Sequence, residues 1–255
     1  MLLAIDIGNT NIVFALCEGM RTLAQWRIRT EMHRTADEYA VWLFALMRER
    51  GFEPSAVRAA ILSSVVPDAN FSVKRFVRSY LNCEPQLIST GEINLGMPVR
   101  IDNPRELGAD RLINAFAAWE EHKHALIIID FGTATTFDVV SGRGEYLGGV
   151  IAPGINLSLE ALRAAAAKLH GVAIAKPERV IGTNTTGAMQ AGIYFGYTGM
   201  IEGIITRIKA ERAEPCKVIA TGGLAPLYAE ATPLIDLVDN DLTIRGLCRI
   251  HEKLS

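Results

Sequence analysis

Few residues in this chain point to a disulfide framework or a metal cage. It contains four cysteines, far apart and without a Cys-x-x-Cys pair, so we expect buried thiols instead. A strong charge of one sign is also missing. The 26 basic side chains are balanced by 28 acidic ones, and no large net field would draw the chain to nucleic acid or to an anionic membrane. Any phosphate binding should therefore be local.

Long apolar segments are missing too. No apolar run reaches the ~18 residues that a membrane span needs, and the segment after Met1 lacks the basic region and cleavage site of a secretory signal. We therefore expect a cytoplasmic protein with no membrane partner and no nucleic-acid partner. With 49% hydrophobic and 21% charged residues, the chain can bury a core without disulfides or a structural metal.

The chain contains an internal repeat. Residues 3–14 can be aligned without gaps to residues 127–138, which places Asp6 on Asp130, 124 positions later. In each segment a β-rich apolar run meets an Asp-x-Gly turn and a second β-rich run follows, which is the pattern of a β-hairpin. Because the spacing is nearly half of the 255 residues, the repeat predicts two related domains.

Helices and strands alternate in both halves, which is typical of an α/β fold. We place the domain boundary between residues 118 and 119, giving domains 1–118 and 119–255. Apolar spacing and flanking signals predict helices over 35–50, 71–82, 156–170 and 186–209, and strands over 59–66 and 217–223.

The repeated turn is suited to phosphate chemistry. Turn amides and hydroxyls can hold phosphate oxygens, while a carboxylate at the end of a strand can hold a cation. Asp6 and Asp130 both have this position. A single Asp-x-Gly turn is more often structural, but its repetition favours a shared site.

Both turns, taken with the later Thr221-Gly222-Gly223, resemble the superfamily of actin, hexokinase and the Hsp70 chaperones. That resemblance implies an α/β fold of two duplicated actin-like, ribonuclease H-like domains facing a nucleotide cleft. It also implies that Gly222 and Gly223 lie near the adenosine.

Further motifs resemble type III pantothenate kinases. The resemblance extends from residue 3 to about residue 247 and keeps the order of four motifs, which are Asp6 to Thr10, Asn103 to Arg111, Asp130 to Thr136 and Gly148 to Gly154. It implies transfer of phosphate from ATP to pantothenate, giving 4′-phosphopantothenate for coenzyme A biosynthesis. It further implies a divalent cation such as Mg²⁺, a potassium or ammonium ion, and a homodimer.

The same resemblance implies roles for individual residues. Asp130 would bind the monovalent cation, Thr133 would be a second ATP contact, and Thr185 would contact pantothenate. The expected ATP phosphate loop is Asp6, Ile7, Gly8, Asn9, Thr10, Asn11, Ile12 and Val13, and the expected substrate segment is Gly108, Ala109, Asp110 and Arg111.

Asp110 would be the general base. A carboxylate near the acceptor hydroxyl can take its proton during phosphoryl transfer, and the adjacent Arg111 can pair with the carboxylate of the substrate. From spacing alone, the two residues instead indicate the charged first turn of a helix. The family resemblance favours the catalytic interpretation.

Other functions remain open at this point. A non-catalytic regulator, an actin-like polymer and a sugar or acetate kinase are all compatible with the fold. The intact acidic and glycine positions favour an enzyme, and Gly108 to Arg111 favours pantothenate as the acceptor. For the homodimer, the alanine-rich stretch Ser158 to Leu169 offers a face for close helix packing.

Overall fold

The computed structural model describes residues 1–88, 95–165, 172–212 and 214–254. The chain divides into two compact units. Unit 1 contains Met1–Met97, Ile101–Glu120 and Asp241–Ser255, and unit 2 contains Pro98–Arg100 and Glu121–Asn240. The C-terminal residues thus belong to the same unit as the N-terminal ones. The domain boundary between residues 118 and 119 stays a prediction.

Unit 1 is built on a five-stranded sheet with the order β3-β2-β1-β4-β5. Strand β1 pairs antiparallel with β2 and parallel with β4. The elements are β1 (Leu2–Ile7), β2 (Asn11–Glu18), β3 (Arg21–Arg29), α1 (Ala36–Glu49), η1 (Pro54–Ala56), β4 (Ala59–Ser64), α2 (Pro67–Leu81), β5 (Pro85–Ile88), η2 (Pro104–Glu106), α3 (Ala109–His122) and α7 (Leu242–Leu254).

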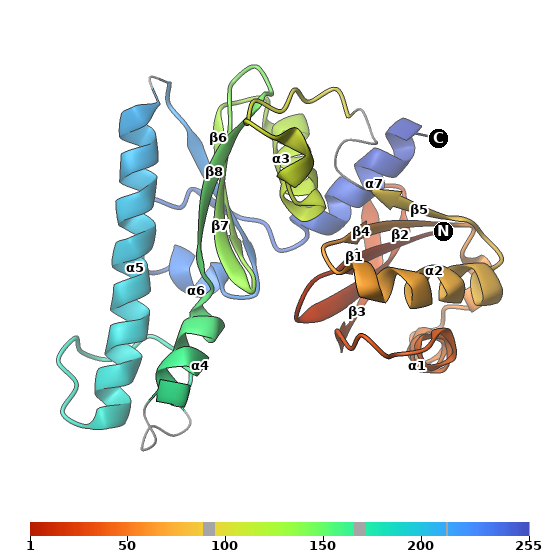
Figure 1. Ribbon diagram of the computed structural model, residues 1–255, viewed down its shortest axis with the longest axis horizontal. Helices are drawn as coiled ribbons and strands as arrows, with labels where there is room; N and C mark the ends of the chain where they lie inside the picture. The colour runs from red at the N-terminus through yellow and green to blue at the C-terminus, as the bar shows by residue number, and fades with distance from the viewer. Residues whose placement is uncertain (89–94, 166–171, 213, 255) are drawn as a thin grey trace. The chain divides into compact units, whose positions relative to one another are not determined.

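Different helices pack against the two faces of this sheet. Leu3, Ile5 and Ile7 of β1 belong to one buried core with residues of α1 and α2. Successive strand residues point to opposite faces, so Asp6 lies on the other face, the one that α7 contacts along β1 and β4. In Figure 1, α7 lies above the strands of this sheet and α1 and α2 lie below them.

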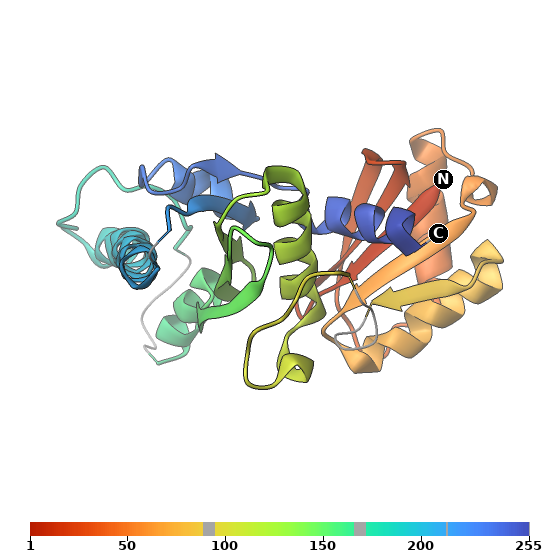
Figure 2. The same cartoon turned by 90° about the horizontal axis from the view of Figure 1, so that it is seen from above.

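Helix α7 also packs closely on α3 (Figure 2). A Cβ atom at Gly246 of α7 would lie 2.5 Å from Cγ2 of Ile113 and 3.1 Å from Cβ of Ala117. A glycine there allows the two helices to approach, and this fixes α3 within unit 1.

Local signals explain where the helices of unit 1 begin. Thr35 and Glu38 form the expected capping box, with the N–H of Thr35 donating to Glu38 Oε2 at 2.7 Å and that of Glu38 donating to Thr35 Oγ1 at 3.3 Å. Helix α2 begins at Pro67, before the predicted residue 71, because proline fits the first turn of a helix. Strand β4 correspondingly ends at Ser64.

Unit 2 repeats the architecture of unit 1. Its sheet has the order β10-β9-β6-β7-β8, which, read in reverse, matches the strand order of unit 1. The elements are β6 (Leu126–Phe131), β7 (Ala134–Val140), β8 (Tyr146–Pro153), α4 (Ile155–Ala165), α5 (Thr185–Glu211), β9 (Lys217–Gly222), α6 (Ala225–Ala229) and β10 (Leu237–Val238).

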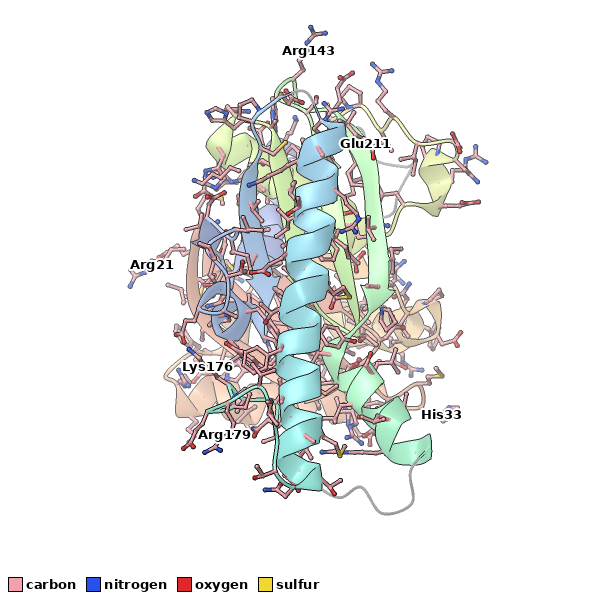
Figure 3. The ribbon with its side chains drawn as sticks, turned by 90° about the vertical axis from the view of Figure 1, so that its left-hand side faces the viewer. Arg21, His33, Arg143, Lys176, Arg179 and Glu211 are labelled. Atoms are coloured by element: carbon pink, nitrogen blue, oxygen red, sulfur yellow. The ribbon has the colours of Figure 1, made fainter. Side chains whose placement is uncertain are left out.

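The helices of unit 2 follow the prediction with shifted ends. Helix α5 is continuous through its glycines, and Asn184 caps it by accepting the N–H of Gly187 at 2.8 Å. In Figure 3 it runs from the end near Lys176 and Arg179 up to Glu211. Helix α4 spans Ile155–Ala165, and the rest of the predicted 156–170 lies outside the described residues.

The duplication is confirmed, with one correction to its alignment. Asp6 pairs with Val13, whereas Asp130 pairs with Thr136, so the second turn is one residue shorter than the first. The ungapped alignment is therefore wrong beyond the turn. The sequence also did not predict the third strand of each meander, β3 and β8, or helix α7.

The structure also describes the cysteines and the length of the apolar helices. Three of the four cysteines are buried, and all four are free thiols. Among the described residues, no helix combines the length and the apolar character needed to cross a membrane.

Candidate functional site

The first Asp-x-Gly turn joins β1 to β2 and is held by the end of β3. The N–H of Gly8 donates to the carbonyl of Asn11 at 3.0 Å. The hydroxyl of Thr30 donates to the carbonyl of Gly8 at 2.6 Å, and its N–H donates to the carbonyl of Thr10 at 3.0 Å. The tip, including Asn9, is exposed. This geometry offers a preformed turn with an accessible tip, as a phosphate loop requires.

Asp6 stands at the base of that turn. It pairs with Val13 on one side and with Ser63 on the other. Burial and, after it, the negative charge of Asp110 raise the pKa of the Asp6 carboxyl to about 7, although the Ser63 hydroxyl and the Arg27 charge act in the opposite direction. A carboxyl with a pKa near neutrality can hold or accept a proton under physiological conditions.

Asp110 lies in the first turn of α3. Its Oδ1 accepts the backbone N–H of Arg111 at 2.8 Å, as a carboxylate at a helix N-terminus does. A Cβ atom at Gly108 would lie 2.5 Å from this oxygen, so the glycine leaves the space that the carboxylate occupies. Burial raises the pKa of Asp110, while the N–H and the charge of Arg111 act against it.

These two carboxylates come together from different elements of unit 1. Asp6 lies at the end of a strand and Asp110 at the start of a helix, 104 positions later. Their repulsion contributes to the raised pKa of Asp6. A pair of carboxyl groups with shifted pKa values is typical of a site that handles protons.

The second turn belongs to unit 2. Asp130 pairs with Thr136 on β7 and with Thr221 on β9. Gly222 has φ of +92°, and a Cβ atom there would lie 2.7 Å from the carbonyl oxygen of Phe131 and 2.9 Å from Asp130 Oδ1. Only glycine fits this close approach.

The oxygen atoms around Gly222 suit a monovalent cation. A carboxylate and a backbone carbonyl are hard oxygen donors, and rings of carbonyl oxygens replace the hydration shell of potassium in other proteins. Asp130 and Phe131 supply both kinds of donor here. In the described part of the chain, no three His, Cys, Asp or Glu residues form a metal-binding group.

Thr133 lies exposed in the second turn, next to the start of α4. Its carbonyl accepts the N–H of Gly154 at 3.1 Å, and a Cβ atom at Gly154 would lie 2.1 Å from the same oxygen. The Gly148 to Gly154 motif thus ends against the Asp130 turn, and its last glycine is required by this contact.

The expected substrate residues lie in two units. Gly108 to Arg111 belongs to unit 1, whereas Thr185 belongs to unit 2. Thr185 is exposed and is the first residue of α5, directly after the capping Asn184.

Sequence reasoning missed the partners of the two aspartates on the neighbouring parallel strands. Ser63 beside Asp6 and Thr221 beside Asp130 are both buried, and they hold the same place in the two sheets. Their signal was a hydroxyl residue at the end of each apolar strand. Arg27 was missed because it belongs to the unpredicted strand β3.

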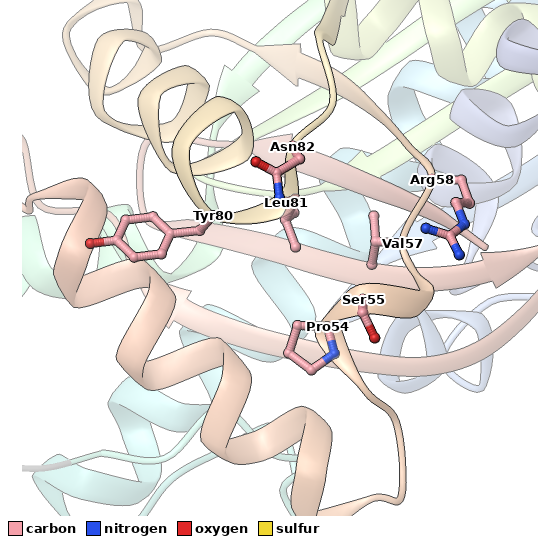
Figure 4. A pocket seen from close by; sticks show the side chains of 7 residues that line it. All are labelled: Pro54, Ser55, Val57, Arg58, Tyr80, Leu81 and Asn82. Atoms are coloured by element: carbon pink, nitrogen blue, oxygen red, sulfur yellow. The ribbon is translucent and has the colours of Figure 1, made fainter.

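A separate pocket lies in unit 1, between η1 and the end of α2 (Figure 4). Its volume is about 250 Å³. It contains none of the residues discussed above, and is lined by Pro54, Ser55, Val57, Arg58, Tyr80, Leu81 and Asn82.

Comparison with known proteins gives one consistent family. The family model for type III pantothenate kinase matches residues 2–207. The type III pantothenate kinase of Paramagnetospirillum magneticum is 54% identical over 255 residues, covering 100% of this chain and 98% of the relative.

Solved structures share the fold at low identity. One from Campylobacter jejuni, described as a Baf family transcriptional activator, has a TM-score of 0.60 and 18% identity, covering 99% of this chain and 98% of the other. One from Sinorhizobium meliloti, described as a 2-dehydro-3-deoxygalactonokinase protein, has a TM-score of 0.61 and 10% identity, covering 100% and 97%. With the repeated sheets, these similarities confirm the expected α/β fold of two duplicated actin-like domains.

Proposed function

Because this chain belongs to the type III pantothenate kinase family, we propose that it transfers the γ-phosphoryl group of ATP to the 4′ hydroxyl of pantothenate. The product, 4′-phosphopantothenate, enters coenzyme A biosynthesis. The observation that carries the proposal is the similarity to curated family members over the full length of the chain. Two carboxylates with raised pKa values in unit 1 support a proton-handling site.

In this proposal, the turn from Asp6 to Val13 binds the phosphates of ATP. Its exposed tip and the hydrogen bonds from Thr30 support that role, because a fixed turn need not be ordered when the nucleotide binds. Thr133 makes a second ATP contact through the second turn, whose shape Gly154 maintains.

Asp110 acts as the general base. It accepts the proton of the 4′ hydroxyl as the phosphoryl group arrives, and this is the step in which a positioned base contributes. Burial raises its pKa above that of an ordinary aspartate, which makes it a better proton acceptor. Its hydrogen bond to the Arg111 N–H orients the carboxylate.

Pantothenate is recognised through its own carboxylate and hydroxyl groups. Arg111 pairs with the carboxylate, since a guanidinium can bind it with two parallel hydrogen bonds. The adjacent residues Gly108 and Ala109 give the substrate access to the start of α3, and Thr185 supplies a hydroxyl from the start of α5.

Two cations support the reaction. Asp130 holds potassium or ammonium, with the Phe131 carbonyl as a further oxygen donor, and a divalent cation such as Mg²⁺ accompanies the nucleotide. When bound, they neutralise part of the charge on the phosphates. Turnover should depend on potassium or ammonium, and equal activity in a sodium-only buffer would contradict the assignment of Asp130.

The active form is a cytoplasmic homodimer. Leu157 and Leu162 of α4 are exposed by 47% and 41%, and exposed apolar side chains on one helix are suited to a second copy of the chain. Light scattering at micromolar concentration should give a dimeric mass. A fully active monomer would contradict this part of the proposal.

A panel of acceptors tests the function. ATP turnover should be measured in a coupled assay with pantothenate, with sugars and with acetate, each at equal concentration. Pantothenate should be the preferred acceptor by a wide margin. Preference for a sugar or for acetate would indicate another phosphotransferase, and no turnover with any acceptor would indicate a regulator or, with concentration-dependent sedimentation, a polymer.

A further inference from the structure

A basic side chain shares the strand register of Asp6. Arg27 of β3 pairs with Val13 of β2, which pairs with Asp6 of β1, which pairs with Ser63 of β4. Residues directly opposite one another in neighbouring strands point to the same face of a sheet. Arg27 and Asp6 therefore lie in one row across the sheet, with a single residue between them.

An arginine in this place can reach the turn. Neighbouring strands are about 4.8 Å apart, so the two Cα atoms are roughly 10 Å apart, and the intervening Val13 is short. Although burial raises the pKa of Asp6, the charge of Arg27 acts on it in the opposite direction. Arg27 is exposed, and it forms no salt bridge within the described residues.

Unit 2 provides an internal comparison. Its matching row contains Thr136, Asp130 and Thr221, with Ile151 of β8 at the place of Arg27. Ile151 is 63% exposed, so this place faces solvent in both units, but only the first carries a positive charge. The row of Asp6, to which Arg27 adds a positive charge, is thus suited to an anion.

We propose that Arg27 is a further phosphate-binding residue, whose guanidinium contacts phosphate oxygens of ATP held at the turn from Asp6 to Val13. The inference rests on the proposed kinase function and deepens it. A guanidinium presents paired N–H donors that match two oxygens of one phosphate. Because β3 is an edge strand of the sheet, the guanidinium of Arg27 can reach a bound nucleotide without any rearrangement of the buried core.

The test is a comparison of two ligands. Binding of ATP with Mg²⁺ and of adenosine should be measured by calorimetry for the wild type, Arg27→Gln and Arg27→Lys. Arg21→Gln is the control, because it removes the same charge from the first residue of β3, six positions before Arg27. Arg27→Gln should weaken ATP binding roughly 10- to 100-fold and leave adenosine binding unchanged.

Arg27→Lys should recover part of the loss, since it restores the charge without the paired donors, and Arg21→Gln should bind ATP like the wild type. The proposal is overturned if Arg27→Gln binds ATP with unchanged affinity, or if ATP and adenosine weaken equally. No acceptor is used in these titrations. A wild type that binds ATP but fails to phosphorylate pantothenate would therefore contradict the proposed function and leave the role of Arg27 standing.

Discussion

Asp110, in the first turn of α3, places a negative charge beside Asp6, at the end of β1. After burial, this charge is the largest contribution that raises the pKa of Asp6, to about 7. In the ligand-free protein near neutral pH, Asp6 thus retains a proton in a large fraction of molecules. The two carboxylates differ in environment, because only Asp110 accepts a hydrogen bond from the start of a helix, and they can therefore serve different roles.

The raised pKa of Asp6 predicts a pH-dependent stability. The folded protein keeps a proton that the unfolded chain, with a carboxyl pKa near 3.8, releases between about pH 4 and pH 7. The free energy of unfolding of the wild type should fall as the pH rises through this window. Asp6→Asn cannot titrate, so it should be more stable than the wild type at pH 8, by an amount on the order of 2 kcal/mol.

Urea denaturation without nucleotide, at pH 4 and at pH 8, provides the measurement. The gain of Asp6→Asn should be near zero at pH 4, where the Asp6 carboxyl is protonated in most folded and in many unfolded molecules. A gain that is the same at both pH values would show that Asp6 is not the titrating group.

Asp110→Asn should separate chemistry from binding. The amide keeps the size of the side chain but cannot accept the proton of the acceptor hydroxyl. We expect kcat to fall by about 10²- to 10⁴-fold while the Kd for ATP changes little. Asp6→Asn should instead alter the dependence on the divalent cation as well as turnover.

If Asp110→Asn keeps near-normal kcat in a folded protein, Asp110 is not the base. Asp6 is then the first alternative, since its pKa is already near neutrality. The loose transition state of phosphoryl transfer would also be compatible with a reaction that needs no strong base.

Gly108→Ala tests whether the position of the Asp110 carboxylate matters. The new Cβ atom would lie 2.5 Å from Asp110 Oδ1, so the carboxylate must move, while the fold should tolerate the change because the atom it meets is the end of a side chain. We expect a loss of kcat of about tenfold or more with little change in the free energy of unfolding.

Gly192→Ala is the matched control, since a Cβ atom there meets nothing within 4 Å. Alanine is the better helix former, by up to about 1 kcal/mol, so this variant should keep full activity and gain stability. Equal activities of the two variants would argue against a precise placement of Asp110.

Much of this fold could be predicted because its signals are local. The repeat around Asp6 and Asp130 predicted the two related units, and the capping box at Thr35 marked the start of α1. The edge strand β3 was missed although buried or half-buried residues alternate with exposed ones from Ala24 to Arg29, which is the pattern of a strand. Helix α7 was missed although its apolar residues, among them Leu247 and Ile250, recur at helical spacing; its packing on Ile113, far away in the sequence, could not be predicted from that spacing.

In the candidate site, too, local features could be predicted and long-range ones could not. Motifs predicted which residues would lie in turns and at helix starts. The proximity of Asp6 to Asp110 and the row that joins Arg27 to Asp6 could not be read from spacing, because they depend on strand register and on where α3 packs. The family resemblance supplied the expected roles of the motif residues, and it gave no expectation for Arg27 or Ser63.

Gly222→Ala tests the cation site. With φ of +92°, and with Phe131 O and Asp130 Oδ1 within 3 Å of the new Cβ atom, alanine should cost about 1–3 kcal/mol of stability and displace the Asp130 carboxylate. The rise in Tm on replacing sodium by potassium should be present in the wild type and lost in the variant.

Gly223→Ala, one residue later, meets nothing within 4 Å and serves as the control. It should keep the potassium-dependent rise in Tm. A Gly222→Ala protein that responds to potassium as the wild type does would place the cation away from Asp130.

The most direct test of the central claim is the stoichiometry of the wild-type reaction in potassium buffer. ADP should be measured enzymatically and the phosphorylated acceptor identified by mass spectrometry. The account predicts one 4′-phosphopantothenate for each ADP, and negligible ADP without pantothenate. Hydrolysis of ATP that is independent of pantothenate, or the absence of phosphorylated pantothenate in a folded, ATP-binding protein, would contradict it.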